Sequence, residues 1–246
     1  TEEEKIRLLK KVKTDASLEN ISSSDLVIEA VFEDLNLKHN LYKKIEPHLK
    51  EGAILASNTS TLPITKLSEV LADSTRFLGI HFFSPVDKMN LVELIKSERT
   101  NDNALAVALD YTSLIKKTPI VVNDSRGFYA NRCIIPYINE GLRMLNEGIE
   151  PALIENSAKQ IGMPVGPLQL LDELSVSLAL NVAKETKEAL GTKYEETGTE
   201  SILLEMSQKN RLGRKELAGF YEYDEKGRRL KLWDCLLYTS PSPRDL

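Results

Sequence analysis

The chain has 246 residues, of which 41% are hydrophobic and 28% charged, and its formal net charge at pH 7 is −5. This length and balance are ordinary for a globular protein of one large or two modest domains. The acidic charge, without a dense Lys/Arg stripe, argues against a nucleic-acid surface, and the apolar runs are far shorter than the ~20 residues of a transmembrane helix.

Short apolar runs alternate with helical patterns in the first half of the chain. Helices are predicted at residues 1–12, 35–49, 63–71 and 103–117, and strands at residues 26–32, 53–57, 76–82, 90–95 and 119–122. In the first helix, Ile6, Leu8 and Leu9 are expected on the inner face. The run LVIEAVF at 26–32 is suited to a strand buried on both faces of a parallel sheet. The alternation predicts βαβ units and a Rossmann-like, doubly wound parallel sheet over residues 1–123.

The chain contains no glycine before Gly52, so it lacks a glycine-rich phosphate loop. The two cysteines, Cys133 and Cys235, give no disulfide framework, and no His/Asp/Glu cluster has metal-ligand spacing.

From residue 124 the pattern becomes helical, after the turn signal NDSRG at 123–127. Helices are predicted at residues 128–148, 151–161, 167–190 and 200–209. Residues 124–234 are therefore predicted to form an all-helical domain. Several of these helices are apolar around much of their surface, so we expect them to be buried in the core of this domain or at a dimer interface. Residues 235–246, CLLYTSPSPRDL, resemble a translated sequencing adapter and are predicted to be a non-native tail.

His81 and Glu93 are the first candidates for chemistry. His81 ends an apolar strand, where a core histidine bonded to backbone is the usual finding. Glu93 is the lone acid in LVELI, and a buried carboxylate is costly without a partner. A Glu–His pair satisfies both residues and leaves one ring nitrogen free to act as a base. The alternative for Glu93 is an edge-strand position that faces water.

The turn SNTST at 57–61 follows a buried strand and offers hydroxyl groups that can orient a substrate oxygen and can cap the helix that begins near Pro63, and we expect some of them to do each. Glu33 and Lys38 follow the first strand, where a cofactor contact competes with a solvated helix start. Asn131 faces either solvent or an interdomain cleft. Position alone leaves these alternatives open.

Four segments resemble the L-3-hydroxyacyl-CoA dehydrogenase family: VIEAVFED at 27–34, ASNTSTLPI at 56–64, GIHFFSPVDKMNLVELI at 79–95 and TPIVVND…GFYANR at 118–132. The segment HFFSPVDKM is most similar to the α-subunits of fatty-acid oxidation multienzymes (the trifunctional enzyme), which also carry an enoyl-CoA hydratase domain.

The resemblance implies a role for each matching residue. His81 takes the place of the catalytic base and Glu93 that of its carboxylate partner. Ser60 and Asn131 correspond to substrate-binding residues. The cofactor-binding positions are Val31, Phe32, Glu33, Lys38, Ser60 and Ser84. Residues 1–123 would then be an NAD-binding domain, and residues 124–234 the substrate and dimerisation domain. Because the chain lacks the family's glycine loop, we expect the first βαβ unit to lie upstream of Thr1, and the chain alone to bind NAD weakly and to be inactive.

The implied reaction is oxidation of an L-3-hydroxyacyl-CoA to the 3-ketoacyl-CoA with NAD⁺, in fatty-acid β-oxidation. The implied partners are a hydratase domain in the same parent chain, a thiolase subunit and a second copy bound through the helical domain. The location would be the cytoplasm in bacteria or the mitochondrial matrix in eukaryotes.

The alternative functions are a β-hydroxyacid dehydrogenase with a catalytic lysine, or an NAD-binding or scaffold domain without turnover. Ser84 and Arg126, which replace a family Asn and Pro, keep the scaffold alternative open.

Overall fold

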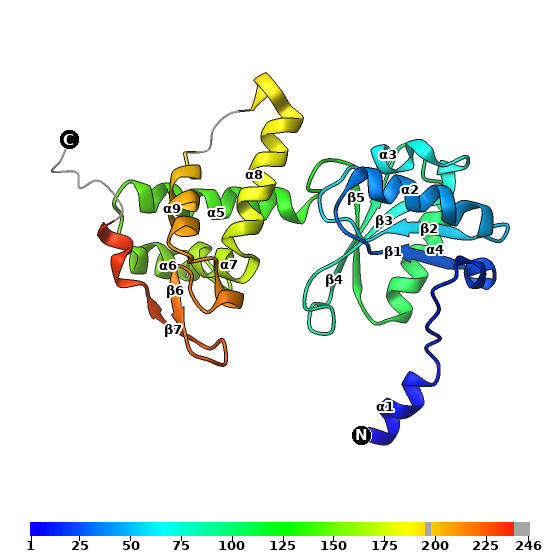
Figure 1. Cartoon of the computed structure of the whole chain (residues 1–246), viewed down its shortest axis with the longest axis horizontal. Coiled ribbons are helices and arrows are strands. Elements are labelled where there is room, and N and C mark those ends of the chain that lie inside the picture. The colour runs from blue at the N-terminus through cyan, green and yellow to red at the C-terminus, as the bar shows by residue number, and fades with distance from the viewer. Residues whose placement is uncertain (195–197, 239–246) are drawn as a thin grey trace. The chain divides into compact units, whose positions relative to one another are not determined.

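The computed structural model describes residues 1–194 and 198–238, and these divide into two compact units, Thr1–Arg132 and the residues from Cys133 onward (Figure 1). Within the described part of the first unit, five strands form one sheet in the order β1-β2-β3-β4-β5. The strands are β1 Leu26–Glu29, β2 Ile54–Ser57, β3 Phe77–Phe82, β4 Leu91–Lys96 and β5 Thr118–Asn123. The helices are α1 Glu2–Leu9, α2 Leu35–Ile45, α3 Ile64–Leu67 and α4 Asp102–Leu114, with 3-10 turns η1 Leu18–Ser23, η2 Glu46–His48, η3 Ser68–Val70 and η4 Ser74–Arg76.

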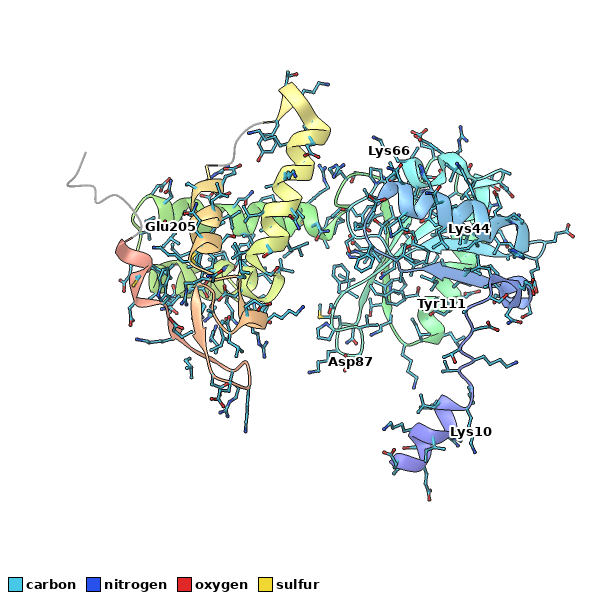
Figure 2. The ribbon with its side chains drawn as sticks, viewed as in Figure 1. Lys10, Lys44, Lys66, Asp87, Tyr111 and Glu205 are labelled. Atoms are coloured by element: carbon cyan, nitrogen blue, oxygen red, sulfur yellow. The ribbon has the colours of Figure 1, made fainter. Side chains whose placement is uncertain are left out.

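The sheet is mostly parallel, which confirms the predicted Rossmann-like class, but one pair differs from the prediction. Strands β3 and β4 pair antiparallel, whereas the β1–β2, β2–β3 and β4–β5 pairs are parallel. A parallel connection needs a crossover of a dozen or more residues, and residues 83–90 are too few for one. The labelled Asp87 lies at the tip of this connection in Figure 2.

Two cores cover the two faces of the sheet. Side chains of α2 and α3 pack on one face with Leu55 and Phe77, while α4 packs on the other face with Ile54 and Leu78. Neighbouring residues of β2 and β3 thus enter opposite cores, as the period of two in a strand requires. This layering places β2 and β3 between α2 and α3 on one face of the sheet and α4 on the other.

The start of the chain departs from the prediction in two ways. Every residue of α1 is exposed, so Ile6, Leu8 and Leu9 do not form an inner face within the described structure. Strand β1 ends at Glu29 and only this residue of the strand is fully buried, so the expectation of a strand buried on both faces to residue 32 is wrong. Because β1 is the edge strand of the described sheet, its outer side lacks a covering neighbour.

The second unit is mainly helical, as predicted, but it also contains strands. Its helices are α5 Ala130–Asn146, which begins in the first unit, α6 Pro151–Gln160, α7 Pro167–Leu174, α8 Val176–Leu190 and α9 Glu200–Gln208, with 3-10 turns η5 Gly191–Lys193, η6 Arg214–Glu216 and η7 Asp234–Tyr238. Strands β6 Tyr221–Tyr223 and β7 Arg229–Leu232 form an antiparallel pair, so the all-helical prediction is incomplete. The helix predicted at 167–190 is broken at Ser175, which has a positive φ of 88°.

Two buried carboxylates hold the hairpin to the helices. Asp172 accepts hydrogen bonds from the N–H groups of Phe220 and Tyr221 and from the Tyr223 hydroxyl, and Glu155 accepts one from the Tyr221 hydroxyl. Within the predicted tail, Leu236 is buried in the core of this unit. Residues 239–246 of that tail lie outside the described residues.

Candidate functional site

The antiparallel pairing of β3 with β4 places His81 directly opposite Glu93. His81 Nδ1 lies 2.7 Å from Glu93 Oε2, and the two residues are 5% and 0% exposed. Glu93 Oε1 accepts the N–H groups of Tyr129 (3.0 Å) and Ala130 (2.8 Å) at the start of α5. Glu93 therefore does not face water, and His81 bonds to a carboxylate rather than to backbone.

The hydrogen bonds around Glu93 determine which nitrogen of His81 carries the proton. Burial acts to raise the pKa of Glu93, but the bonds from His81 and Ala130 outweigh burial and lower the pKa below its usual value. An ionised carboxylate only accepts hydrogen bonds, so Nδ1 of His81 must be the donor. Among residues 1–194 and 198–238, Nε2 of His81 has no hydrogen-bond partner. In the neutral ring, this nitrogen holds a lone pair suited to accept a proton.

The SNTST turn is held by Glu33 from the neighbouring strand end. Glu33 Oε1 accepts the Thr59 hydroxyl (2.6 Å) and the N–H groups of Ser60 and Thr61 (both 2.9 Å). Burial raises the pKa of Glu33, yet the bonds from Thr59 and Thr61 and the charge of Lys38 lower it more, so the net pKa falls below its usual value. Glu33 is therefore an ionised anchor of the turn.

Helix α3 is capped by Asp124 and not by a hydroxyl of the turn, which corrects the capping prediction. The Asp124 carboxylate accepts the N–H groups of Ile64 (2.9 Å) and Thr65 (2.8 Å) and the Thr65 hydroxyl. Asp124 follows β5, 60 residues later in the chain than Ile64. The ends of β2 and β5 are thus joined through the first turn of α3.

The other predicted residues lie around the same strand ends. Asn131 Nδ2 donates to the carbonyl oxygen of Ser60 at 2.9 Å, so these two predicted substrate residues are in contact. Val31 and Phe32 are 39% and 87% exposed beyond the end of β1, where they offer apolar surface to a flat ring. Ser84 is exposed in the β3–β4 connection.

Lys38 is not solvated, although its helix pattern favoured that alternative. Its side chain is 1% exposed, and Nζ lies 2.7 Å from Glu29 Oε1 and 3.4 Å from Glu33 Oε2. Lys38 therefore lies beneath the strand ends, in an ion-pair cluster with two carboxylates.

Two family models match consecutive parts of the chain. Residues 1–125 match the 3-hydroxyacyl-CoA dehydrogenase NAD-binding domain, and residues 127–223 match the 3-hydroxyacyl-CoA dehydrogenase C-terminal domain. The chain belongs to the 3-hydroxyacyl-CoA dehydrogenase family. Its first unit is accordingly an NAD-binding domain, and the chain is classed with NAD-dependent 3-hydroxyacyl-CoA dehydrogenases.

Solved structures of this family resemble the chain over most of its length. (S)-3-hydroxybutyryl-CoA dehydrogenase PaaH1 from Ralstonia eutropha is 37% identical, with a TM-score of 0.82 over 92% of this chain and 80% of that one. FadB2 of M. tuberculosis is 32% identical, with a TM-score of 0.83 over 91% and 79%. The dehydrogenase part of multifunctional enzyme 1 from C. elegans is 27% identical, with a TM-score of 0.66 over 97% and 54%.

One buried residue near this site, Glu29, was not predicted to take part. It is the acid inside the apolar run LVIEAVF, and the argument from burial cost that singled out Glu93 applies to it equally.

Among the residues described, none of the helices has the length and apolarity to cross a membrane. In the same residues, no group of three or more His, Cys, Asp or Glu side chains is placed to hold a metal ion.

Proposed function

We propose that the parent protein of this chain oxidises an L-3-hydroxyacyl-CoA at C3 to the 3-ketoacyl-CoA with NAD⁺, and that His81 is the catalytic base. The observation that carries the proposal is the His81–Glu93 pair, in which Glu93 holds Nδ1–H and leaves Nε2 open. A base in this arrangement takes the C3 hydroxyl proton at Nε2. Glu93 stabilises the imidazolium ion that forms, as a carboxylate does beside a histidine base in other enzymes.

NAD⁺, when bound, would supply the acceptor for the hydride that leaves C3. The residues proposed to hold NAD⁺ are Val31, Phe32, Glu33, Ser60 and Ser84, with Lys38 beneath them. The exposed apolar surface of Val31 and Phe32 fits a nucleotide ring, and Glu33 and Ser60 supply polar groups at adjacent strand ends. These ends are where cofactors bind in open α/β sheets. A glycine-loop unit that precedes Thr1 in the parent protein is part of the proposal.

Ser60 and Asn131 are proposed to orient the reacting oxygen of the substrate. The two residues are already joined by a hydrogen bond of 2.9 Å, which restricts the position of the Asn131 side chain. Orientation of this kind lowers the entropic part of the barrier to hydride transfer.

The test is reduction of acetoacetyl-CoA by NADH, followed by the loss of NADH absorbance, in the parent protein and in His81→Gln. Glutamine keeps a polar side chain without a base, so turnover should fall by about 10³-fold or more while NADH affinity changes little. His39→Gln is the matched control, since His39 is assigned no role at the site and its Nε2 bonds to the Lys66 carbonyl oxygen, between α2 and α3. Near-normal turnover of His81→Gln would refute the assignment.

We further propose a role in fatty-acid β-oxidation, with an enoyl-CoA hydratase domain in the same parent chain and a thiolase partner subunit. The similarity to part of a multifunctional enzyme supports this context.

A homodimer through the second unit is proposed from its exposed apolar side chains, including Leu153, Ile161 and Leu204. The location would be the cytoplasm or the mitochondrial matrix. Sequencing upstream of the codon for Thr1 tests the hydratase domain, and light scattering tests the dimer.

A further inference from the structure

Glu29 is a buried carboxylate that the proposed mechanism leaves without a role. It lies at the end of β1 and is 4% exposed. Its Oε1 accepts the N–H of Val31 and Nζ of Lys38, both at 2.7 Å. Its Oε2 accepts the hydroxyl groups of Tyr42 at 2.7 Å and Ser57 at 2.8 Å. Each oxygen is thus paired with two donors, as a buried carboxylate requires.

One of these contacts leads directly to the SNTST turn. The Ser57 hydroxyl donates its hydrogen to Glu29, so its oxygen is oriented to accept the N–H of Thr59 at 3.1 Å. Thr59 precedes Ser60, and its hydroxyl accepts the N–H of Leu62 at 3.0 Å on the far side of the turn. The orientation of the first half of the turn therefore depends on Glu29.

A second route from Glu29 reaches the same turn through two charges. Glu29 binds Lys38 Nζ, which lies 3.4 Å from Glu33 Oε2, and the other oxygen of Glu33 accepts the N–H groups of Ser60 and Thr61. Lys38 sits between two carboxylates and is itself buried. Its position, and through it the position of Glu33, is set by the carboxylate that binds it more closely.

We propose that Glu29 is a positioning residue that holds the Ser57–Thr61 turn and Glu33 in place for the cofactor. It acts through Ser57 on one side and through Lys38 on the other, without touching cofactor or substrate. The catalytic consequence rests on the proposed function, whereas the ordering of the turn does not. Glu29→Gln tests both, because glutamine has one acceptor oxygen and must turn its NH₂ group toward two of the donors that now face Glu29.

Amide hydrogen exchange, measured by mass spectrometry on this chain, tests the ordering of the turn. In Glu29→Gln, exchange of the peptide that covers residues 58–62 should accelerate about tenfold or more, since its bonds to Ser57 and Glu33 are weakened. Glu155→Gln is the matched control, because Glu155 is also buried (2% exposed) and accepts the N–H groups of Leu168 and Gln169 and the Tyr221 hydroxyl in the second unit. This control should leave exchange of 58–62 unchanged. Equal exchange of 58–62 in wild type and Glu29→Gln would overturn the inference.

Ser57→Ala provides a milder variant should Glu29→Gln not fold. It removes one of the bonds to Glu29 and should accelerate exchange of the Thr59 N–H in particular; unchanged exchange there contradicts the Ser57 route.

In the parent enzyme, Glu29→Gln should raise the KM for NADH about tenfold with kcat within about threefold, a split that loss of folded protein does not produce. An altered turn with an unchanged KM refutes the cofactor role. An inactive wild type refutes the proposed function, while hydrogen exchange still decides the ordering of the turn.

Discussion

Asn131 and Ser60 are 71 positions apart in the chain, yet the Asn131 side chain donates to the Ser60 carbonyl at 2.9 Å. The bond ties the first turn of α5 to the turn that follows β2. A single hydrogen bond near the surface contributes only about 1 kcal/mol to stability. The bond also restricts the direction of the Asn131 amide.

Asn131→Ala should lower kcat/KM for acetoacetyl-CoA by about 10- to 100-fold, because it removes the amide that we propose orients the substrate oxygen. The unfolding midpoint should change little. Asn20→Ala is a control, since Asn20 also uses its side-chain amide in an exposed hydrogen bond, to Asp15. Steady-state kinetics and thermal unfolding of both variants measure the effects. A kcat/KM for Asn131→Ala equal to that of Asn20→Ala would contradict the role.

Glu93→Gln should lower kcat by about 10³- to 10⁴-fold with little change in KM. The oxygen of the glutamine is expected to accept the N–H groups of Tyr129 and Ala130, which turns its NH₂ group toward His81 Nδ1. The ring must then carry its hydrogen on Nε2, where the base is needed. Pre-steady-state kinetics separate the chemical step from product release. Retention of more than a tenth of kcat would show that the tautomer is not controlled by Glu93.

Asp172 should make the second unit less stable as the pH rises from about 4 to about 6. Burial raises the pKa of Asp172 to about 6 from 3.8, although the N–H groups of Phe220 and Tyr221 act in the opposite direction. The folded state therefore binds the proton of Asp172 more tightly than the unfolded state does, and protonation stabilises the folded unit. This stabilisation is complete below pH ~4 and is lost as the pH rises through 6, by up to about 3 kcal/mol.

Urea unfolding at several pH values measures this effect. The fluorescence of Trp233, the single tryptophan, reports on the second unit, because Trp233 packs against its core. Asp172→Asn should be less stable than wild type at pH 4, and the difference between the two proteins should shrink as the pH rises to 7. A constant difference across this range would contradict the prediction.

Asp124→Ala should loosen α3 and destabilise the first unit by about 1–2 kcal/mol, since it removes the cap from two backbone N–H groups. Asp124→Asn should lose less, because its amide oxygen can still accept one of them. Chemical denaturation followed by circular dichroism compares the variants. Equal losses in both variants would indicate that the charge, rather than the hydrogen-bond geometry, matters.

The sequence pattern predicted the strands and single residues of the site better than the pairing of the strands and the contacts between distant residues. The period of apolar residues located β2 to β5, and the cost of burying a carboxylate singled out Glu93. The antiparallel pairing that brings Glu93 opposite His81 was missed, because the pattern of a strand does not record the direction of its neighbour. Lys38 lies in a charged helix start, and its burial depends on Glu29, nine residues earlier.

In the second unit, too, the sequence pattern did not predict contacts between residues that are far apart in the chain. The β6–β7 hairpin is short, and the hydroxyl groups of Tyr221 and Tyr223 bond to Glu155 and Asp172, which lie 66 and 51 positions earlier in the chain. The same holds for Asp124 in the first unit. A cap normally lies beside its helix in the sequence, so the sequence pattern did not indicate that Asp124 caps α3.

That distant cap has a consequence for how the protein is made. Helix α3 has only four residues, too few to persist before tertiary contacts form, and its capping carboxylate leaves the ribosome some 60 residues later. Helix α3 therefore gains its cap only after β5 has been made and has docked beside β4. This long-range closure should slow the folding of the first unit. The cap of the helix that follows the SNTST turn is accordingly a contact that forms late in the synthesis of the first unit.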